Sequence, residues 1–170
     1  ELDPQLAEAV PTIENGLWTV LPDGRMETTW KLKPGLKWHD GAPLTTDDLL
    51  FTAMVARDKD VPRSTRPVGY EAVDSIEARD AQTIVLKWKR PFIEADRMST
   101  RLSSLPMPEH ILVKTYLEDK TALPQHPHLP LRRQRIVGNG RGVGDDVRVV
   151  VGVRAGESVG RLRHDDVAVV

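Results

Sequence analysis

The first part of the chain alternates apolar and polar positions with the period of a half-buried β-strand. Over residues 26–33 one face carries charged or polar side chains, and the other face carries Met26, Thr28, Trp30 and Leu32. Pro34 and Gly35 break the alternation, and Leu36 and Trp38 then resume it. The pattern predicts a strand with one buried face, followed by a short extended segment.

A tight turn and the start of a capped helix are predicted next. Asp40 can bond its own backbone and Gly41 can take a positive φ, so we expect the chain to turn there. Thr45 is a good N-cap residue. Asp48 follows three residues later, where its carboxylate can reach back to the cap or meet the positive end of the helix dipole.

The predicted helix begins near Thr46 and ends within residues 57–60, because Pro62 cannot continue it. Its apolar positions recur at helical spacing and cluster on one side; they are Leu49, Leu50, Ala53, Met54 and Ala56. We therefore expect this side to face a core.

A β-hairpin is predicted in the middle of the chain. Residues 73–78 and 83–89 have strand patterns and are joined by the polar segment 79–82. The face of the second strand that carries Ile84, Leu86 and Trp88 should be buried. Three further elements are predicted in order: a helical stretch over 92–100, a helix over 109–117 and a surface loop over 124–130.

Taken together, the order of these segments resembles one known family. The resemblance is carried by residues 4–8, by the Asp23 and Gly24 turn, by 29–35, by the run from Trp38 to Asp48, by the strand pair around Ile76 and Ile84, and by 105–112. These segments resemble the family 5 extracellular solute-binding proteins, which are the oligopeptide, dipeptide and nickel receptors of ABC importers. The resemblance covers about residues 1 to 130.

The resemblance implies an α/β fold: a partial lobe of a type II periplasmic-binding-protein-like clamshell, with a mixed sheet and flanking helices. It also implies the substrate-binding component of an ABC transporter, which captures peptides or similar small solutes and passes them to an ABC permease of the inner or cytoplasmic membrane. Such a protein is a monomer, uses no cofactor and does no covalent chemistry. Its expected location is periplasmic or extracytoplasmic, at the membrane through the transporter.

Complete members of that family are much longer and enclose their ligand between two lobes. The first residues resemble an internal segment of the family, so we expect a fragment that does not bind ligand alone. Within it, the resemblance places ligand near residues 66–70 and 104–107. Tyr70, with an aromatic face and a hydroxyl, and Met107, as an adaptable apolar wall, are the predicted ligand-binding residues. Groups that grip peptide termini would belong to the missing lobe.

Composition narrows the function classes. The 170 residues are 39% hydrophobic with a formal net charge of −1, which is typical of a globular domain and does not indicate a nucleic-acid partner. The chain has no cysteine, so disulfides and thiolate sites are excluded while the cellular compartment is left open. The expected location rests on the resemblance alone.

The chain divides by composition into a predicted lobe, 1–131, and an atypical tail, 132–170. The tail contains eight Arg and no Lys, lacks aromatic residues and is rich in Val and Gly. Our hypothesis is a frameshift near Leu129 to Arg132, which would leave the tail disordered or loosely packed. The alternative is a genuine tail in the native frame.

Two other function classes are alternatives to a solute receptor. A hydrolase could use His39 and Asp40, but neighbouring strand residues point to opposite faces and no nucleophile is presented, so a turn role is favoured. A stand-alone structural or partner-binding module derived from one lobe is the other alternative.

The remaining polar and aromatic candidates have simpler interpretations. Asp47 and Asp48 are explained by the first helical turn. His126 and His128 make too few ligands for a metal site, so no metal is predicted. Among the tryptophans, Trp30 and Trp88 are expected in the core, and Trp18 and Trp38 are left open.

Overall fold

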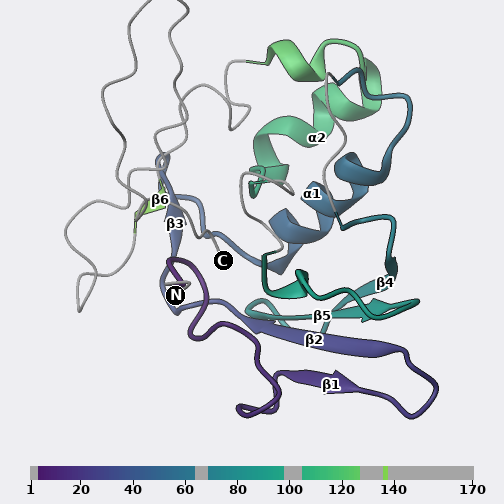
Figure 1. Ribbon diagram of the computed structural model, residues 1–170. Coiled ribbons are helices and arrows are strands. Elements are labelled where there is room, and N and C mark those ends of the chain that lie inside the picture. Colours follow the sequence, from purple (N-terminus) through teal and green to yellow (C-terminus); the bar gives the residue numbers. More distant parts are fainter. Residues whose placement is uncertain (1–3, 64–68, 98–104, 127–135, 138–170) are drawn as a thin grey trace, which may run out of the picture.

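The computed structural model describes residues 4–63, 69–97, 105–126 and 136–137. A four-stranded sheet has the order β1-β2-β5-β4 and is antiparallel throughout (Figure 1). Its strands are β1 (Trp18–Val20), β2 (Met26–Lys31), β4 (Val73–Ala78) and β5 (Thr83–Trp88). The α/β class is confirmed, although the strand pairs that are described are all antiparallel where we expected a mixed sheet.

The register gathers the large apolar side chains on one face of the sheet. Thr28 pairs with Leu86, and Trp30 pairs with Ile84, so these four side chains share a face. The burial of β2 alternates along the strand as the pattern predicted. The hairpin of β4 and β5 is confirmed too, and a β-bulge interrupts its register between Val73 and Ser75.

Helix α1 (Thr46–Arg57) begins at the predicted cap. The Thr45 side chain and the Asp48 side chain form a reciprocal capping box. Thr46 also fixes this end to the β4–β5 turn, because its hydroxyl donates to the Asp80 carbonyl at 2.7 Å and its backbone N–H donates to the Ala81 carbonyl at 3.1 Å. The start of α1 is therefore held both locally and by the hairpin.

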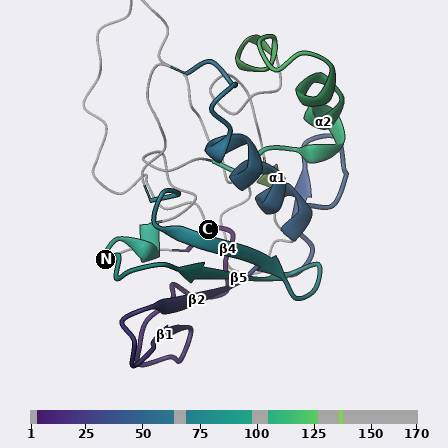
Figure 2. The ribbon, with the colours of Figure 1, turned by 90° about the vertical axis from the view of Figure 1, so that its right-hand side faces the viewer.

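Two apolar clusters lie on different sides of α1. The sheet core contains Leu49 and Ala53 of α1 together with the buried sheet residues and, among others, Leu6, Ala7, Trp38 and Tyr70. The interhelical core lies between α1 and α2 (Glu109–Glu118); it consists of Phe51, Val55, Val61, Met107, Leu112, Tyr116 and Leu123. Figure 2 shows α1 between the sheet and α2.

The predicted apolar side of α1 was partly wrong. Met54 is 46% exposed, whereas Phe51 and Val55, which the prediction omitted, are buried. The reason is that α1 buries two sides, one against the sheet and one against α2, so its apolar positions do not form one stripe.

The later elements follow the predictions with differences at their ends. Helix α2 ends one residue beyond the predicted 109–117. Within 92–100 the described residues form only the 3₁₀ turn η1 (Ala95–Arg97), and 98–100 lie outside the described residues. In the predicted loop 124–130 a 3₁₀ turn, η2 (Leu123–Gln125), forms first, and residues 127–130 are not described.

A second, two-stranded sheet joins two distant parts of the chain. Strand β3 (Lys37–Trp38) pairs antiparallel with β6 (Ile136–Val137), which is the described part of the predicted tail. The rest of 132–170 lies beyond the described residues, so the predicted division at residue 131 stays a prediction. In the part of the chain that is described, no helix has the length and apolarity needed to cross a bilayer.

Candidate functional site

The carboxylate of Asp48 lies at the junction of β3, α1 and α2. One of its oxygens accepts hydrogen bonds from Trp38 Nε1 at 3.1 Å and from the Thr45 backbone N–H at 2.9 Å. The other accepts from the backbone N–H of Glu109, the first residue of α2, at 2.9 Å. Asp48 is 4% exposed. Burial raises the pKa of its carboxyl, and the three donors oppose that rise.

Asp40 makes a second connection to the start of α2. Its Oδ1 accepts from the Ala42 backbone N–H at 3.1 Å, and Gly41 has a φ of 88°, so the predicted turn is confirmed. Its Oδ2 lies 2.8 Å from His110 Nε2. This contact with His110 lowers the pKa of Asp40. Asp40 is therefore a turn residue that also links the turn to α2.

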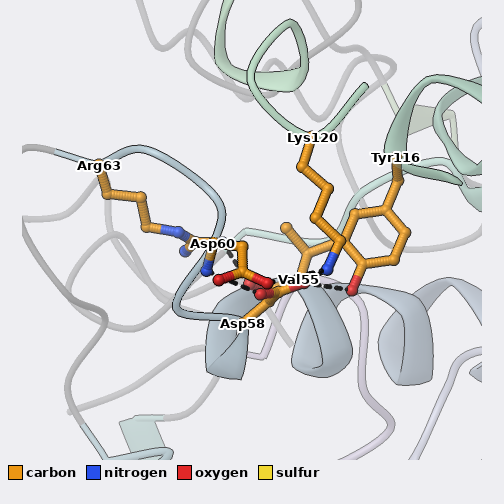
Figure 3. Close-up of polar contacts among 6 residues, drawn as sticks. All are labelled: Val55, Asp58, Asp60, Arg63, Tyr116 and Lys120. Atoms are coloured by element: carbon orange, nitrogen blue, oxygen red, sulfur yellow. Dashed lines mark hydrogen bonds and ion pairs between the residues drawn. The ribbon is translucent and has the colours of Figure 1, made fainter. Parts of the chain in front are cut away.

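A polar cluster lies where α1 ends, and Figure 3 shows Tyr116 and Lys120 both directed at Asp58. Asp58 is the C-cap of α1 and accepts a hydrogen bond from the Tyr116 hydroxyl at 2.5 Å. The ammonium of Lys120 lies 2.7 Å from the same carboxylate and 3.5 Å from that of Asp60. It also lies 5.2 Å from the centroid of the Tyr116 ring. The ends of α1 and α2 are thus joined.

Arg63 contacts the same end of α1, on the side of the cluster away from Lys120 and Tyr116 (Figure 3). Its guanidinium donates to the Val55 carbonyl at 2.5 Å, and this carbonyl also accepts from the Asp58 backbone N–H at 3.2 Å. The last carbonyls of a helix lack partners within the helix and carry partial negative charge. Arg63 supplies both a hydrogen-bond donor for a carbonyl at this helix end and a positive charge that offsets the partial negative charge there.

The electrostatics of this cluster do not prepare any group for proton transfer. The bond from Lys120, followed by that from Tyr116, lowers the pKa of Asp58, and Asp58 raises the pKa of Lys120. Burial, with the bond to Asp58, raises the pKa of Tyr116. Each pKa shift stabilises the state that its group ordinarily has at neutral pH, which is ionised for Asp58 and protonated for Lys120 and Tyr116. A general base or an activated nucleophile needs a pKa shift in the opposite direction. The cluster can fix structure and present charge.

An open groove of about 440 Å³ lies beside this cluster, between α1 and β4. Its lining is mainly apolar, with charge from the last turn of α1, and consists of Leu50, Ala53, Met54, Arg57, Asp58 and Ile76. The exposed Met54 therefore lies in a hollow. A concave apolar surface with few polar groups is the usual form of a binding surface.

The two predicted ligand residues lie apart from one another. Tyr70 belongs to the sheet core and Met107 to the interhelical core, and each is 6% exposed. Burial raises the pKa of Tyr70, and the Met107 backbone N–H donates to Thr52 Oγ1 at 2.8 Å. Their contact with ligand stays a prediction. Residues 66–68 and 104 of the two predicted ligand segments lie outside the described residues.

The tryptophans extend the predicted core. Trp30 and Trp88 are buried in the sheet core as predicted, and Trp88 Nε1 donates to Thr28 Oγ1 at 3.0 Å. Trp38, whose role was left open, is buried there as well, and Trp18 packs against the same core while partly exposed. These side chains serve packing.

The acidic and histidine candidates divide between confirmed and untested roles. Asp47 and Asp48 lie in the first turn of α1, as predicted. Among the described residues no group of three or more His, Cys, Asp or Glu side chains could hold a metal ion. His128, one of the weak metal candidates, lies outside the described residues.

Sequence reasoning missed the partners that join the two helices. Tyr116 and Asp58 are 58 positions apart, and His110 and Asp40 are 70 apart. Spacing along a helix predicts only near neighbours. The one local signal was the four-residue spacing of Tyr116 and Lys120, which does not indicate the carboxylate that both bind.

Comparison with known proteins finds that the chain is similar to solute-binding proteins. The family model of bacterial extracellular solute-binding proteins, family 5, Middle, matches residues 1–130. The oligopeptide-binding protein AppA of Bacillus subtilis strain 168 is 33% identical over 98 residues, which is 57% of this chain and 18% of the relative. An oligopeptide-binding protein from Thermus thermophilus, crystallised with a pentapeptide, is 29% identical with a TM-score of 0.53, and the match covers 66% of this chain and 18% of that protein.

NikZ from Campylobacter jejuni, in complex with Ni(L-His), shares the fold. Its TM-score is 0.57 at 21% identity, over 88% of this chain and 29% of its own. The chain spans less than a third of the length of each of these proteins.

Proposed function

Because the chain belongs to the family 5 bacterial extracellular solute-binding proteins, we propose that it forms part of the solute-binding component of an ABC importer for peptides or similar small solutes. The observation that carries the proposal is the family match over residues 1–130. Members of this family are periplasmic or extracytoplasmic receptors, and we propose the same location here, at the membrane through an ABC permease.

The proposed mechanism is capture by closure of two lobes. A ligand that contacts both lobes binds the closed state better than the open state and shifts the population toward closure. This chain contributes part of one lobe, so the two-sided contact requires chain that it does not contain. We therefore propose that the 170 residues alone bind peptide negligibly.

Tyr70 and Met107 stay our proposed ligand contacts. Because each is 6% exposed, a ligand would meet the margin of the side chain and its neighbouring backbone. Substituting Tyr70→Phe would separate a hydroxyl contact from packing of the ring.

A chimaeric receptor tests the function. Residues 4–126 of this chain would replace the matching segment of AppA, and peptide binding would be measured by calorimetry beside unmodified AppA. We expect a folded chimaera, verified by circular dichroism, to bind oligopeptides within about tenfold of AppA. A folded chimaera without binding would contradict the proposal. In the same instrument, micromolar peptide binding by the isolated chain would contradict the need for a second lobe.

A stand-alone partner-binding module is the second candidate, and the open groove beside α1 favours it. Known relatives are receptors rather than enzymes, and Asp40 of the proposed hydrolase pair binds His110 of α2. No contact of the described residues favours the hydrolase.

A further inference from the structure

An extended segment, 105–108, leads into α2 and is buried along its length. Between its two prolines, Pro106 and Pro108, only Met107 has a backbone N–H, because proline has none. This N–H donates to Thr52 Oγ1 of α1 at 2.8 Å. A single side chain of α1 therefore accepts the one backbone hydrogen bond that this part of the segment can donate.

The hydroxyl of Thr52 is oriented by its own helix. It donates to the backbone carbonyl of Asp48, one turn earlier in α1, at 2.6 Å. A carbonyl can only accept, so the hydroxyl proton points at Asp48 and a lone pair is left for the Met107 N–H. Thr52 is 1% exposed, so both bonds lie away from bulk solvent. The hydroxyl is thus held as an acceptor for the segment.

The same turn of α1 binds two alternate amides of the chain. The Asp48 carboxylate accepts from the Glu109 backbone N–H, and the Thr52 hydroxyl accepts from that of Met107. Residues four apart share a helix face and are separated by one turn, which rises about 5.4 Å, while two residues of extended chain span about 6.6 Å. The two acceptors therefore match the spacing of the two amides and set the segment in register along α1.

This register decides where the Met107 side chain lies, which is in the interhelical core. A slip of the segment by one residue would bring Pro106 or Pro108 to Thr52, and neither can donate a backbone hydrogen bond. The segment therefore has no neighbouring register that keeps the bond to Thr52.

We propose that Thr52 is a positioning residue of the ligand site. Its hydroxyl fixes the register of 105–108 on α1 and so the place at which Met107 meets ligand. The inference rests on the proposed function, in which Met107 contacts ligand. Thr52 is buried, acts through Met107 and does not itself contact ligand.

Amide hydrogen exchange in the full 170-residue chain tests the register. Thr52→Val keeps the branched shape of the side chain and removes the hydroxyl. We expect exchange at the Met107 amide to become at least about tenfold faster, and Thr52→Ser, which restores a hydroxyl, to stay within about threefold of the unaltered chain. The Leu32 amide, which donates to the Gln82 carbonyl, reports on the sheet and should not change.

Thr28→Val is the matched control variant. Thr28 is also a buried threonine, and its Oγ1 accepts from Trp88 Nε1 at 3.0 Å in the sheet core. The substitution therefore removes a buried acceptor of the same kind in the other core. A general loss of stability would speed exchange at Met107 in both variants, whereas we expect the faster exchange only in Thr52→Val.

The chimaeric receptor with AppA connects the register to ligand. Calorimetry would compare oligopeptide binding by the unaltered chimaera with Thr52→Val, Thr52→Ser and Thr28→Val, each verified as folded by circular dichroism. We expect binding about tenfold weaker in Thr52→Val and within about threefold of the unaltered chimaera in the other two. Thr52→Ala takes the place of the valine variant if that does not fold.

A double substitution tests whether Thr52 acts through Met107. In a chimaera that already carries Met107→Ala, adding Thr52→Val should change the affinity by less than about twofold, because residues that act as a unit have non-additive effects. An undiminished tenfold effect there would show that Thr52 acts by another route and would overturn the proposal.

Other results would overturn it as well. Unchanged exchange at Met107 in Thr52→Val would remove the register. Equal peptide binding by the folded unaltered and Thr52→Val chimaeras, or an equal loss in Thr28→Val, would remove the positioning role and leave the proposed function in place. A folded unaltered chimaera that does not bind would contradict the proposed function itself, and the positioning role with it.

Discussion

Helix α1 is joined to α2 through a carboxylate at each end, and the two ends have opposite electrostatics. Asp48, at the N-terminal end, is buried and accepts only from neutral donors, two of which are backbone amides. Asp58, at the C-terminal end, lies nearer solvent and binds the ammonium of Lys120. Burial raises the pKa of Asp48, whereas Lys120 lowers that of Asp58.

The difference shows that the same connection between helices can depend on geometry at one end and on charge at the other. A buried carboxylate is costly unless every donor is in place, and each of those donors would be costly without it. A partly exposed ion pair such as Lys120 and Asp58 depends on charge attraction, which salt and protonation weaken. The two ends should therefore respond differently to substitution, pH and salt.

The largest effect is expected from Asp48→Ala. The change leaves Trp38 Nε1 and the backbone N–H groups of Thr45 and Glu109 without their acceptor in a buried place. We expect a loss of about 3 kcal/mol in the free energy of unfolding, measured by urea titration. Asp47→Ala, in the exposed part of the same turn, is the control and should cost about 0.5 kcal/mol. Equal losses would show that the buried acceptor has no special role.

A smaller effect is expected at the other end from Tyr116→Phe. The substitution keeps the ring against Phe51, whose centroid lies 5.7 Å away, and removes only the hydroxyl bond to Asp58. Because Lys120 still neutralises Asp58, the loss should be roughly a third of that for Asp48→Ala in the same titration. A loss as large as at Asp48 would mean that the C-terminal end also depends on geometry.

The two carboxylates should give stability slopes of opposite sign against pH. The pKa of Asp58 is lower in the folded chain than its usual 3.8, so its contribution is present above pH 3.8 and is lost as pH falls through the folded value. The pKa of Asp48 is raised above 3.8, so its contribution is present below pH 3.8 and is lost as pH rises through the folded value.

Melting temperatures measured from about pH 3 to 7 test these slopes. Asp58→Asn should remove the rise in stability with pH at the acidic end. Asp48→Asn should remove the fall in stability just above pH 3.8. Parallel changes in the two variants would refute the assignment of opposite shifts.

Salt should produce the smallest difference. Lys120→Gln removes the cation at the C-terminal end, and we expect a modest fall in melting temperature that disappears in about 1 M NaCl. The effect of Asp48→Asn should be the same at both salt concentrations, since its partners are uncharged. A salt-dependent effect at Asp48 would contradict the electrostatic contrast.

Local features of the sequence predicted the local features of the fold. The capping box of α1 and the hairpin of β4 and β5 involve residues close together in the chain, so spacing and residue type were sufficient. The same holds for the turn at Asp40 and Gly41. Within that limit β2, α1 and the hairpin of β4 and β5 were predicted in their order, whereas β1 was not predicted.

Features that depend on distant contacts could not be predicted in this way. Met54 is apolar at a helical spacing that indicates a core, yet it is exposed because the packing of α2 decides which other side of α1 is buried. The partners of Asp58 come from the second helix, and nothing near Asp58 indicates them. The groove arises from α1 and β4 together and has no motif of its own.

The attachment of Thr46 to the β4–β5 turn has a consequence for synthesis on the ribosome. Thr45 and Asp48 can cap α1 as soon as they leave the exit tunnel, because the capping box is local. The hydroxyl of Thr46, however, bonds to Asp80, which is made 34 residues later. Contacts so distant in sequence form late because a long loop must close first. The nascent helix can therefore bond to the β4–β5 turn only after that turn has been made. A pause in translation before residue 80 would leave α1 capped but not attached to the turn.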